Sequence, residues 1–174
     1  VVTNVVLSSA EAYAVDSDIT TTGDVLLDAA NTSGIDATVL SATSSGDTGV
    51  GITLAFNTLG WQSQNFLFNA VDALLGDPLI SGAFDGEQPA ATRAFLRDTV
   101  VDAGGDLTLT AVNEALLNAT VSNAAESTTS ALYGAAGVSS SGILASNFVN
   151  TAARAFIDDT GAAGTVQVGG SLTL

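Results

Sequence analysis

Apolar and polar residues alternate along short stretches of this chain, with the period of two that is typical of strands buried on one face. The alternation is clear at Leu107/Leu109 and at Leu172/Leu174, and the run Ile35/Ala37/Val39 also alternates. Gly, Asn, Asp and Ser separate the stretches, and all four residue types favour turns. The pattern predicts an all-β protein built from many short strands.

The stretches recur in a longer repeat, whose first marker is an Asn followed by an aromatic residue. The three copies of this marker are Asn4/Tyr13, Asn57/Phe95 and Asn147/Phe156. The separation is the same in the first and last copies and much longer in the middle one, which indicates an insertion there. Such spacing favours an architecture in which each unit buries its apolar face against the next.

A glycine that leads into a strand is the second marker of the repeat, and it occurs at Gly23, Gly105 and Gly170. The offset that carries Tyr13 onto Phe95 also carries Gly23 onto Gly105. About four strand-like runs fall within each unit, namely the aromatic run, the run after the glycine, the alternating run at residues 35–39 and the run of residues 49–57. We expect a β-solenoid with two or three coils per unit.

The recurring side chains have a structural and a functional interpretation. Asn tolerates the left-handed conformation and its amide bonds to the backbone, so Asn4 and its equivalents mark a turn or an inward-facing ladder. The alternative for them is ligand recognition. We interpret the recurring aromatic residue as a stacked residue of the core rather than as a binding platform.

Residues 60–90 depart from the strand pattern and form the insertion. Within it, residues 63–76 place apolar side chains on one helical face, and a Gly and a Pro end the run. We therefore expect one short helix on the flank of the solenoid. The insertion either covers a lateral apolar strip or binds a ligand. Its candidate interaction residues are Trp61, Phe66 and Phe84.

The charge and hydropathy of the chain exclude some classes of binding partner. Eighteen acidic residues stand against three basic ones, all of them Arg, and the formal net charge is −15. So acidic a surface repels nucleic acid and anionic lipid, and we expect neither as a partner. The apolar runs are shorter than the roughly 18 residues of a transmembrane helix, so no membrane span is expected.

Catalysis has few side chains available. Without His, Lys or Cys, a Ser nucleophile lacks its usual base, and thiol or Schiff-base chemistry is excluded. Carboxylate pairs such as Asp16 with Asp18, or Asp24 with Asp28, remain as acid–base candidates for a polysaccharide-active enzyme. Such enzymes generally also need basic groups, which are scarce here. We expect no enzyme, no catalytic residues and no organic cofactor.

Calcium is the one remaining cofactor candidate. Asp16 with Asp18, and Asp158 with Asp159, lie in oxygen-rich turns that could supply carboxylate and carbonyl ligands. The Gly-Gly-x-Gly-x-Asp pattern of calcium-binding repeats is absent. Solvated acidic turns are the alternative.

The motifs Asn-x-Val/Leu, Ala-Tyr/Phe and Gly-Asp-Leu/Val-x-Leu-x-Ala, together with the insert from Gly60 to Gly76, resemble the repeats of giant bacterial filamentous adhesins. These are the leukotoxin-like or haemagglutinin-like β-helix surface proteins, and the resemblance covers nearly the whole chain. It implies a right-handed β-helix that is secreted to the cell surface and serves adhesion, aggregation or filament formation. The implied partners are neighbouring repeats, through end-to-end or lateral self-assembly, and a surface glycan or protein.

The two ends of the sequence, at Val1 and at Leu174, read as the middle of strands. We therefore expect residues 1–174 to be a single solenoid segment of a longer repetitive protein, with residues 60–90 as an insertion within it.

Overall fold

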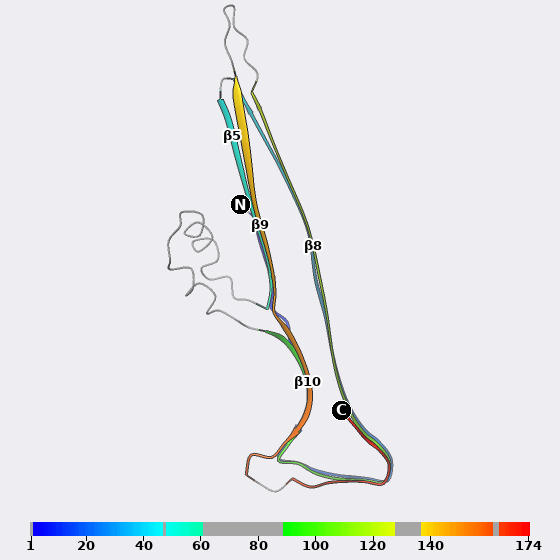
Figure 1. The fold of residues 1–174 in the computed structure, drawn as a ribbon. Helices are drawn as coiled ribbons and strands as arrows, with labels where there is room; N and C mark the ends of the chain where they lie inside the picture. The colour runs from blue at the N-terminus through cyan, green and yellow to red at the C-terminus, as the bar shows by residue number, and fades with distance from the viewer. Residues whose placement is uncertain (1, 47, 61–88, 128–136, 162–163) are drawn as a thin grey trace, which may run out of the picture. The chain divides into compact units, whose positions relative to one another are not determined.

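The computed structural model describes residues 2–46, 48–60, 89–127, 137–161 and 164–174 (Figure 1). These residues form β-strands joined by turns, and no helix occurs among them. The strands are β1 (Val2–Val6), β2 (Ala10–Val15), β3 (Asp18–Thr21), β4 (Val25–Ser45), β5 (Thr48–Leu59), β6 (Ala90–Arg97), β7 (Val100–Ala103), β8 (Leu107–Ser127), β9 (Val138–Val149), β10 (Thr151–Asp158), β11 (Val166–Val168) and β12 (Leu172–Thr173). The predicted all-β class is confirmed.

The strands form four three-stranded sheets, with the orders β1-β5-β9, β10-β6-β2, β11-β7-β3 and β12-β8-β4. The chain thus passes through the four sheets in the same sequence three times, leaving one strand in each. We call these passages coil 1 (β1–β4), coil 2 (β5–β8) and coil 3 (β9–β12). The described pairings between coils are parallel and in register. This arrangement is consistent with the predicted β-solenoid.

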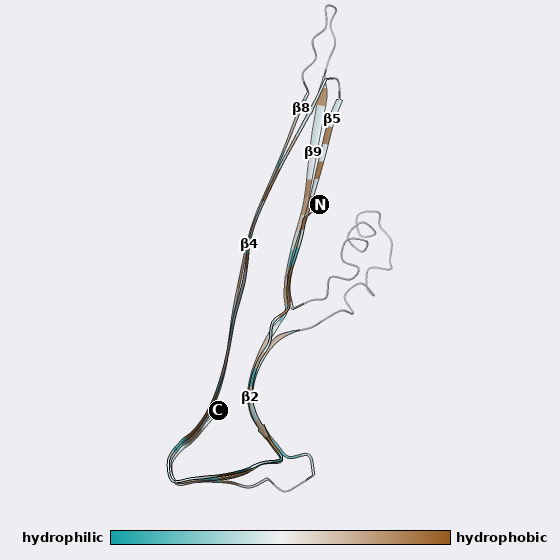
Figure 2. Cartoon of the chain, turned by 180° about the vertical axis from the view of Figure 1, so that it is seen from behind, coloured by the Kyte–Doolittle hydropathy of each residue, from teal (hydrophilic) through white to brown (hydrophobic). Residues whose placement is uncertain are grey.

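One repeat unit makes one coil, so the prediction of two or three coils per unit was wrong. The run after the glycine and the alternating run around residues 35–39 belong to a single strand, β4, which is 21 residues long. Buried and exposed positions alternate along it without a break through Asn31, Thr32, Ser33 and Gly34, although Asn, Ser and Gly favour turns. The separate short strand β3 was not expected. Figure 2 shows hydrophobic and hydrophilic residues succeeding one another along these strands.

The chain divides into two compact units, and each is described by itself. Unit 1 comprises Val1–Val6, Gly34–Glu87 and Leu116–Val149, and unit 2 comprises Leu7–Ser33, Gln88–Ala115 and Asn150–Leu174. Strands β4 and β8 contribute residues to both.

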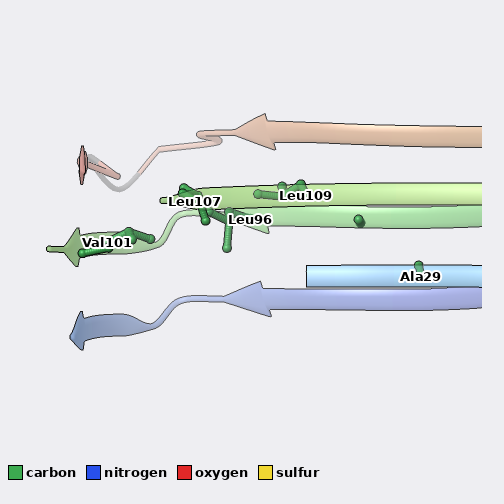
Figure 3. Close-up of a cluster of buried hydrophobic side chains, with 7 residues drawn as sticks. Ala29, Leu96, Val101, Leu107 and Leu109 are labelled. Carbon is green, nitrogen blue, oxygen red and sulfur yellow. The ribbon is translucent and has the colours of Figure 1, made fainter. Parts of the chain in front are cut away.

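Unit 2 holds a core of small and medium-sized side chains. Its members are Ala29, Ala94, Leu96, Val101, Ala103, Leu107 and Leu109. Figure 3 draws this cluster and labels Ala29, Leu96, Val101, Leu107 and Leu109. They come from all the strands of coil 2 in this unit and from β4 of coil 1, and apolar residues of coils 1 and 3 pack against them. Coil 2 therefore supplies most of the buried material, since it has a coil on each side.

Unit 1 brings its two layers of strands close together at glycines of β5. A Cβ atom at Gly51 would lie 2.9 Å from Thr43 Oγ1 and 3.1 Å from Asn123 Oδ1. At Gly49 it would lie 3.0 Å from the carbonyl oxygen of Glu126. Asn123 donates hydrogen bonds of 3.0 Å from its amide nitrogen to Gly51 O and Gly142 O. The absence of side chains at these glycines lets polar groups cross the narrow interior.

The predicted helical insertion, residues 60–90, lies outside the described residues except at its ends. Gly60 N donates to Val6 O at 2.9 Å in unit 1, and Ala90 N donates to Asn150 O at 2.9 Å in unit 2. In coil 3 the corresponding strands β9 and β10 are separated by Asn150 alone. The insertion therefore lengthens the link between β5 and β6, whereas coil 3 makes the equivalent link with one residue.

Candidate functional site

The outward face of sheet β10-β6-β2 gathers charged and aromatic side chains. In β6, Ala94 and Leu96 belong to the core, so Arg93, Phe95 and Arg97 lie on the opposite face of the strand. The register of the sheet aligns three rows across the coils: Glu11–Arg93–Arg154, Tyr13–Phe95–Phe156 and Val15–Arg97–Asp158. We call these nine residues the arginine face.

Aromatic stacking occupies the middle row. The ring centroids of Tyr13 and Phe95 are 5.3 Å apart with 13° between the planes, and those of Phe95 and Phe156 are 5.0 Å apart with 3° between them. The predicted stacking is confirmed, whereas the expected burial holds for Phe95, which is 8% exposed, and not for Tyr13, which is 60% exposed. The core side of the same strands carries Ala12, Ala94 and Leu96 instead.

Ion pairs connect neighbouring coils in the two outer rows. Arg93 Nη1 lies 3.0 Å from Glu11 Oε1, and Arg97 Nε lies 3.3 Å from Asp158 Oδ2. The Arg97 guanidinium also lies 5.4 Å from the centroid of the Phe95 ring. The paired side chains are 37% to 46% exposed. Each pair is therefore worth at most about 1 kcal/mol.

All three basic side chains of the protein lie on the arginine face. Within the part of the chain that the structure describes, Arg154 forms no ion pair. Sequence reasoning did not single out this cluster. A signal for it existed, because Arg93 and Arg154 each precede the recurring aromatic residue by two positions and so share its face.

The recurring Asn residues meet in unit 1. Asn4 Nδ2 donates to Asn57 Oδ1 at 2.8 Å, and Asn57 Nδ2 donates to Asn147 Oδ1 at 2.9 Å. Asn57 is 2% exposed. Its amide is thus engaged by its neighbours on both sides, as a ladder that joins the three coils.

Two of the recurring glycines, Gly105 and Gly170, lie under carboxylates of the preceding coil. Asp24 Oδ1 accepts a hydrogen bond of 2.8 Å from Asp106 N, and Asp106 Oδ1 accepts one of 2.7 Å from Ser171 N. A Cβ atom at Gly105 would collide with the Asp24 carboxylate, and one at Gly170 with that of Asp106. Glycine recurs here because each aspartate reaches over it to the next coil.

A second acidic turn follows the aromatic strands. Asp16 and Asp98 occupy equivalent positions three residues after Tyr13 and Phe95, and both adopt the left-handed conformation with φ of 47°. Asp98 accepts hydrogen bonds from Thr160 N at 2.6 Å and from the Thr160 hydroxyl. These hydrogen bonds hold the pKa of Asp98 below its ordinary value. The hydrogen bond from the Thr160 hydroxyl is the largest cause, and the charge of Arg97 makes a smaller contribution.

The calcium candidates are not brought together into one site. Asp16 lies in the turn before β3 and Asp18 begins β3, whereas Asp158 ends β10 and pairs with Arg97. Asp159 lies beside Gly164, and a Cβ atom at Gly164 would collide with the Asp159 carboxylate. Among the described residues, no three acidic side chains gather closely enough to hold a metal ion. Calcium binding stays a prediction.

The remaining candidates are placed as follows. Asp24 bonds to the next coil, as described, and Asp28 is exposed on β4. The insertion residues Trp61, Phe66 and Phe84 lie outside the described residues. The described chain contains no helix with the length and apolarity that a bilayer crossing requires.

No protein-family model, curated protein or solved structure matches the chain. What the protein does is therefore argued from the geometry above.

Replacing Thr160 by Val is expected to raise the pKa of Asp98, because the hydroxyl is the largest cause of its lowering. The folded-state pKa lies below the unfolded one. The contribution of ionised Asp98 to the stability of the fold is therefore complete above the pKa of Asp98 in the unfolded chain. It is lost as the pH falls through the pKa of Asp98 in the folded protein. Carboxyl-carbon NMR titration measures the change. Thr160→Ser keeps the hydroxyl and should keep the low pKa, and an unchanged pKa in Thr160→Val would contradict the assignment.

Proposed function

We propose that this chain is a structural and adhesive module of a filamentous bacterial surface protein, and that its coils form a right-handed β-solenoid. The observation that carries the proposal is that the recurring side chains join one coil to the next. The amide ladder of Asn4, Asn57 and Asn147 and the aromatic stack of Tyr13, Phe95 and Phe156 both do so.

The acidic residues support the same interpretation. The carboxylates of Asp24, Asp98 and Asp106 each accept a hydrogen bond from the backbone of the next coil. A carboxylate so engaged is oriented by the scaffold rather than presented to a substrate. The repeat thus recurs at positions that determine stacking, as expected of a rod assembled from nearest-neighbour contacts.

Parallel pairing in four sheets explains why such a module suits a filament. The backbone hydrogen bonds of a parallel sheet run between coils and therefore along the stacking direction. Stretching or bending the stack therefore requires many of these backbone hydrogen bonds to break together. A net charge of −15 keeps the exposed surface well solvated outside the cell.

Two deletions in the host bacterium test the proposal. Removal of the coding region for the whole segment, Val1 to Leu174, is expected to reduce surface attachment or cell aggregation. Removal of residues 61–88 alone, with Gly60 joined to Pro89, is expected to leave attachment unchanged, because coil 3 makes the same connection with Asn150 alone. An epitope tag within residues 128–136 reports surface exposure on intact cells that carry the segment with or without residues 61–88.

The outcomes separate the alternatives. Loss of attachment on removal of residues 61–88, with the tag still exposed, would assign the function to a glycan- or protein-binding insertion instead. Attachment that survives removal of the whole segment would refute the proposed role.

A further inference from the structure

The sheet β1-β5-β9 lies wholly in unit 1, and its three strands contain no charged residue. Each of the other three described sheets carries acidic side chains, for example Glu11 in β2, Asp102 in β7 and Asp28 in β4. The formal net charge of the chain is −15. Among the four described sheets, this one alone offers a second molecule a contact free of charged strand residues.

The outward face of this sheet carries a strip of mainly aliphatic side chains. Gly51 of β5 faces the opposite layer of unit 1, where its Cβ atom would lie 2.9 Å from Thr43 Oγ1. Because successive residues of a strand point to opposite faces, the even-numbered residues of β5 point outward. These residues and their register partners in β9 form what we call the uncharged strip: Thr48, Val50, Ile52, Leu54, Val138, Ser140, Gly142 and Leu144.

The strip is the part of this face that the chain itself leaves uncovered. Val50, Ile52 and Val138 are exposed, whereas Phe56 and Thr58, farther along the same face of β5, are buried. A further coil would extend the sheet at its edges, in the direction of the hydrogen bonds between strands. The outward face of β5 and β9 would stay open, because it is perpendicular to that direction.

An exposed apolar strip marks contact with another molecule, because aliphatic side chains gain free energy when they leave water. Anionic lipid and nucleic acid carry charge over their whole contact surface, and the chain repels them. A second copy has the same net charge of −15, but its own uncharged strip provides a contact in which no charged strand residues meet. Charge therefore favours strip against strip over the other contacts between copies.

We propose that the uncharged strip packs against the uncharged strip of a second copy of this chain, so that two solenoids associate side by side. The inference rests on the proposed structural function and names the surface through which modules associate laterally. Each copy contributes the same patch, so the contact is isologous. Two sheets packed face to face lie about 10 Å apart, a spacing that interdigitating side chains fill.

The salt dependence of this contact has a definite direction. The screening length falls from about 10 Å at 0.1 M salt to about 3 Å at 1 M. Added NaCl therefore weakens the repulsion between two chains of net charge −15. It does not weaken contact between aliphatic side chains, which depends on water rather than on charge. We expect the association constant of the purified chain, measured by sedimentation velocity, to rise with NaCl concentration, whereas a contact made by ion pairs would weaken.

A unique thiol reports whether the strip is covered, because the chain contains no cysteine. Ile52→Cys places the thiol in the strip, and Asn118→Cys places it on an exposed position of β8 in the same unit. We expect maleimide labelling at position 52 to slow as the protein concentration rises, in proportion to the fraction of paired chains. Labelling at position 118 should stay constant. End-to-end stacking of coils would leave both thiols reactive, so it is not mistaken for lateral pairing.

An introduced carboxylate tests the same contact without a label. Ile52→Asp places a charge in the strip, and Asn118→Asp adds the same charge on β8 outside it. We expect the association constant to fall about tenfold or more for Ile52→Asp and to change by less than about twofold for Asn118→Asp. Both substitutions place Asp at an exposed strand position, so the midpoints of thermal unfolding in dilute solution should be similar.

Four results would overturn the inference. They are a thiol at position 52 that reacts equally fast at every protein concentration, equal association of Ile52→Asp and Asn118→Asp, and association that weakens as salt is added. The fourth is a thiol at position 52 that is protected even in dilute solution, which would make the chain itself the occupant of the strip. None of them bears on the deletion experiments in the host bacterium. A strip that stays free, in a segment whose deletion still abolishes attachment, would leave the structural function standing and remove only the lateral partner.

Discussion

Gly104→Ala is expected to lower the free energy of unfolding by about 2–3 kcal/mol, as overpacking of a close contact does. A Cβ atom at this position would lie 2.6 Å from the carbonyl oxygen of Thr22 and 3.0 Å from its carbonyl carbon. Both atoms belong to the backbone of the preceding coil. They cannot move aside without loosening the hydrogen bond of 2.9 Å from Gly104 N to Thr21 O. Urea unfolding followed by circular dichroism measures the loss.

Gly142→Ala is the control for this prediction. Gly142 lies in strand β9, and a Cβ atom there would have no neighbour within 4 Å. Alanine should be neutral or stabilise the protein by up to about 1 kcal/mol, since it restricts the unfolded chain. Equal losses in the two variants would show that coil spacing is not what requires glycine at position 104.

Asn57→Asp is expected to destabilise the protein by about 3 kcal/mol at pH 7, because a buried polar group that loses its partner costs about 1–3 kcal/mol and a charged one costs more. The substitution places a carboxylate at a site that is 2% exposed. It also replaces the group that donates to Asn147 Oδ1 with an acceptor. The measurement is the difference in unfolding free energy between variant and wild type.

The pH dependence of this difference has a definite sign. Burial and the facing oxygen of Asn147 raise the pKa of the new carboxyl above that of an unfolded Asp, so the folded state binds the proton first. The variant's deficit is therefore largest above the raised pKa and shrinks as the pH falls towards that of the unfolded group. A protonated carboxyl can again donate to Asn147. Asn118→Asp, on an exposed position of β8, should change stability by less than about 0.5 kcal/mol at either pH.

The register of the coils could be predicted from sequence because stacking is encoded by spacing. Asn57 and Phe95 lie on different sheets, yet each aligns with its counterparts in the other coils, as their repetition implied. The insertion does not disturb this alignment, since it lengthens a link between strands and leaves the strands themselves unchanged. An insertion within a strand would have shifted the rows.

The number of coils per unit could not be predicted because local turn propensity is overridden inside β4. Asn31 and Ser33 favour turns when they stand alone, but here both lie on the buried side of an extended strand. Asn31 Nδ2 donates to Ser8 Oγ at 3.1 Å. A partner from another segment thus satisfies the amide that would otherwise fold back on its own backbone, and no local pattern reveals such a partner.

The location of the aromatic row could not be predicted for a different reason. A period of two shows which residues share a face of a strand, but it does not show which face is inside. In these strands the inner face carries Ala12 and Ala94, and the rings lie on the opposite face. Arg93 and Arg97 share the face of Phe95, so they lie outside with the rings. The expectation that the rings face the core therefore also concealed the arginine face.

The amide ladder has a direction, and this gives the whole stack a polarity. Each amide nitrogen donates towards the following coil, from Asn4 to Asn57 and from Asn57 to Asn147, so the dipoles of the three side chains add. Chains of aligned hydrogen bonds polarise one another. A coil added after Asn147 therefore meets a donor surface, whereas one added before Asn4 meets an acceptor. The two ends of the ladder are chemically distinct: a reversed coil would place donor against donor at the Asn147 end and acceptor against acceptor at the Asn4 end, so neither contact could continue the ladder.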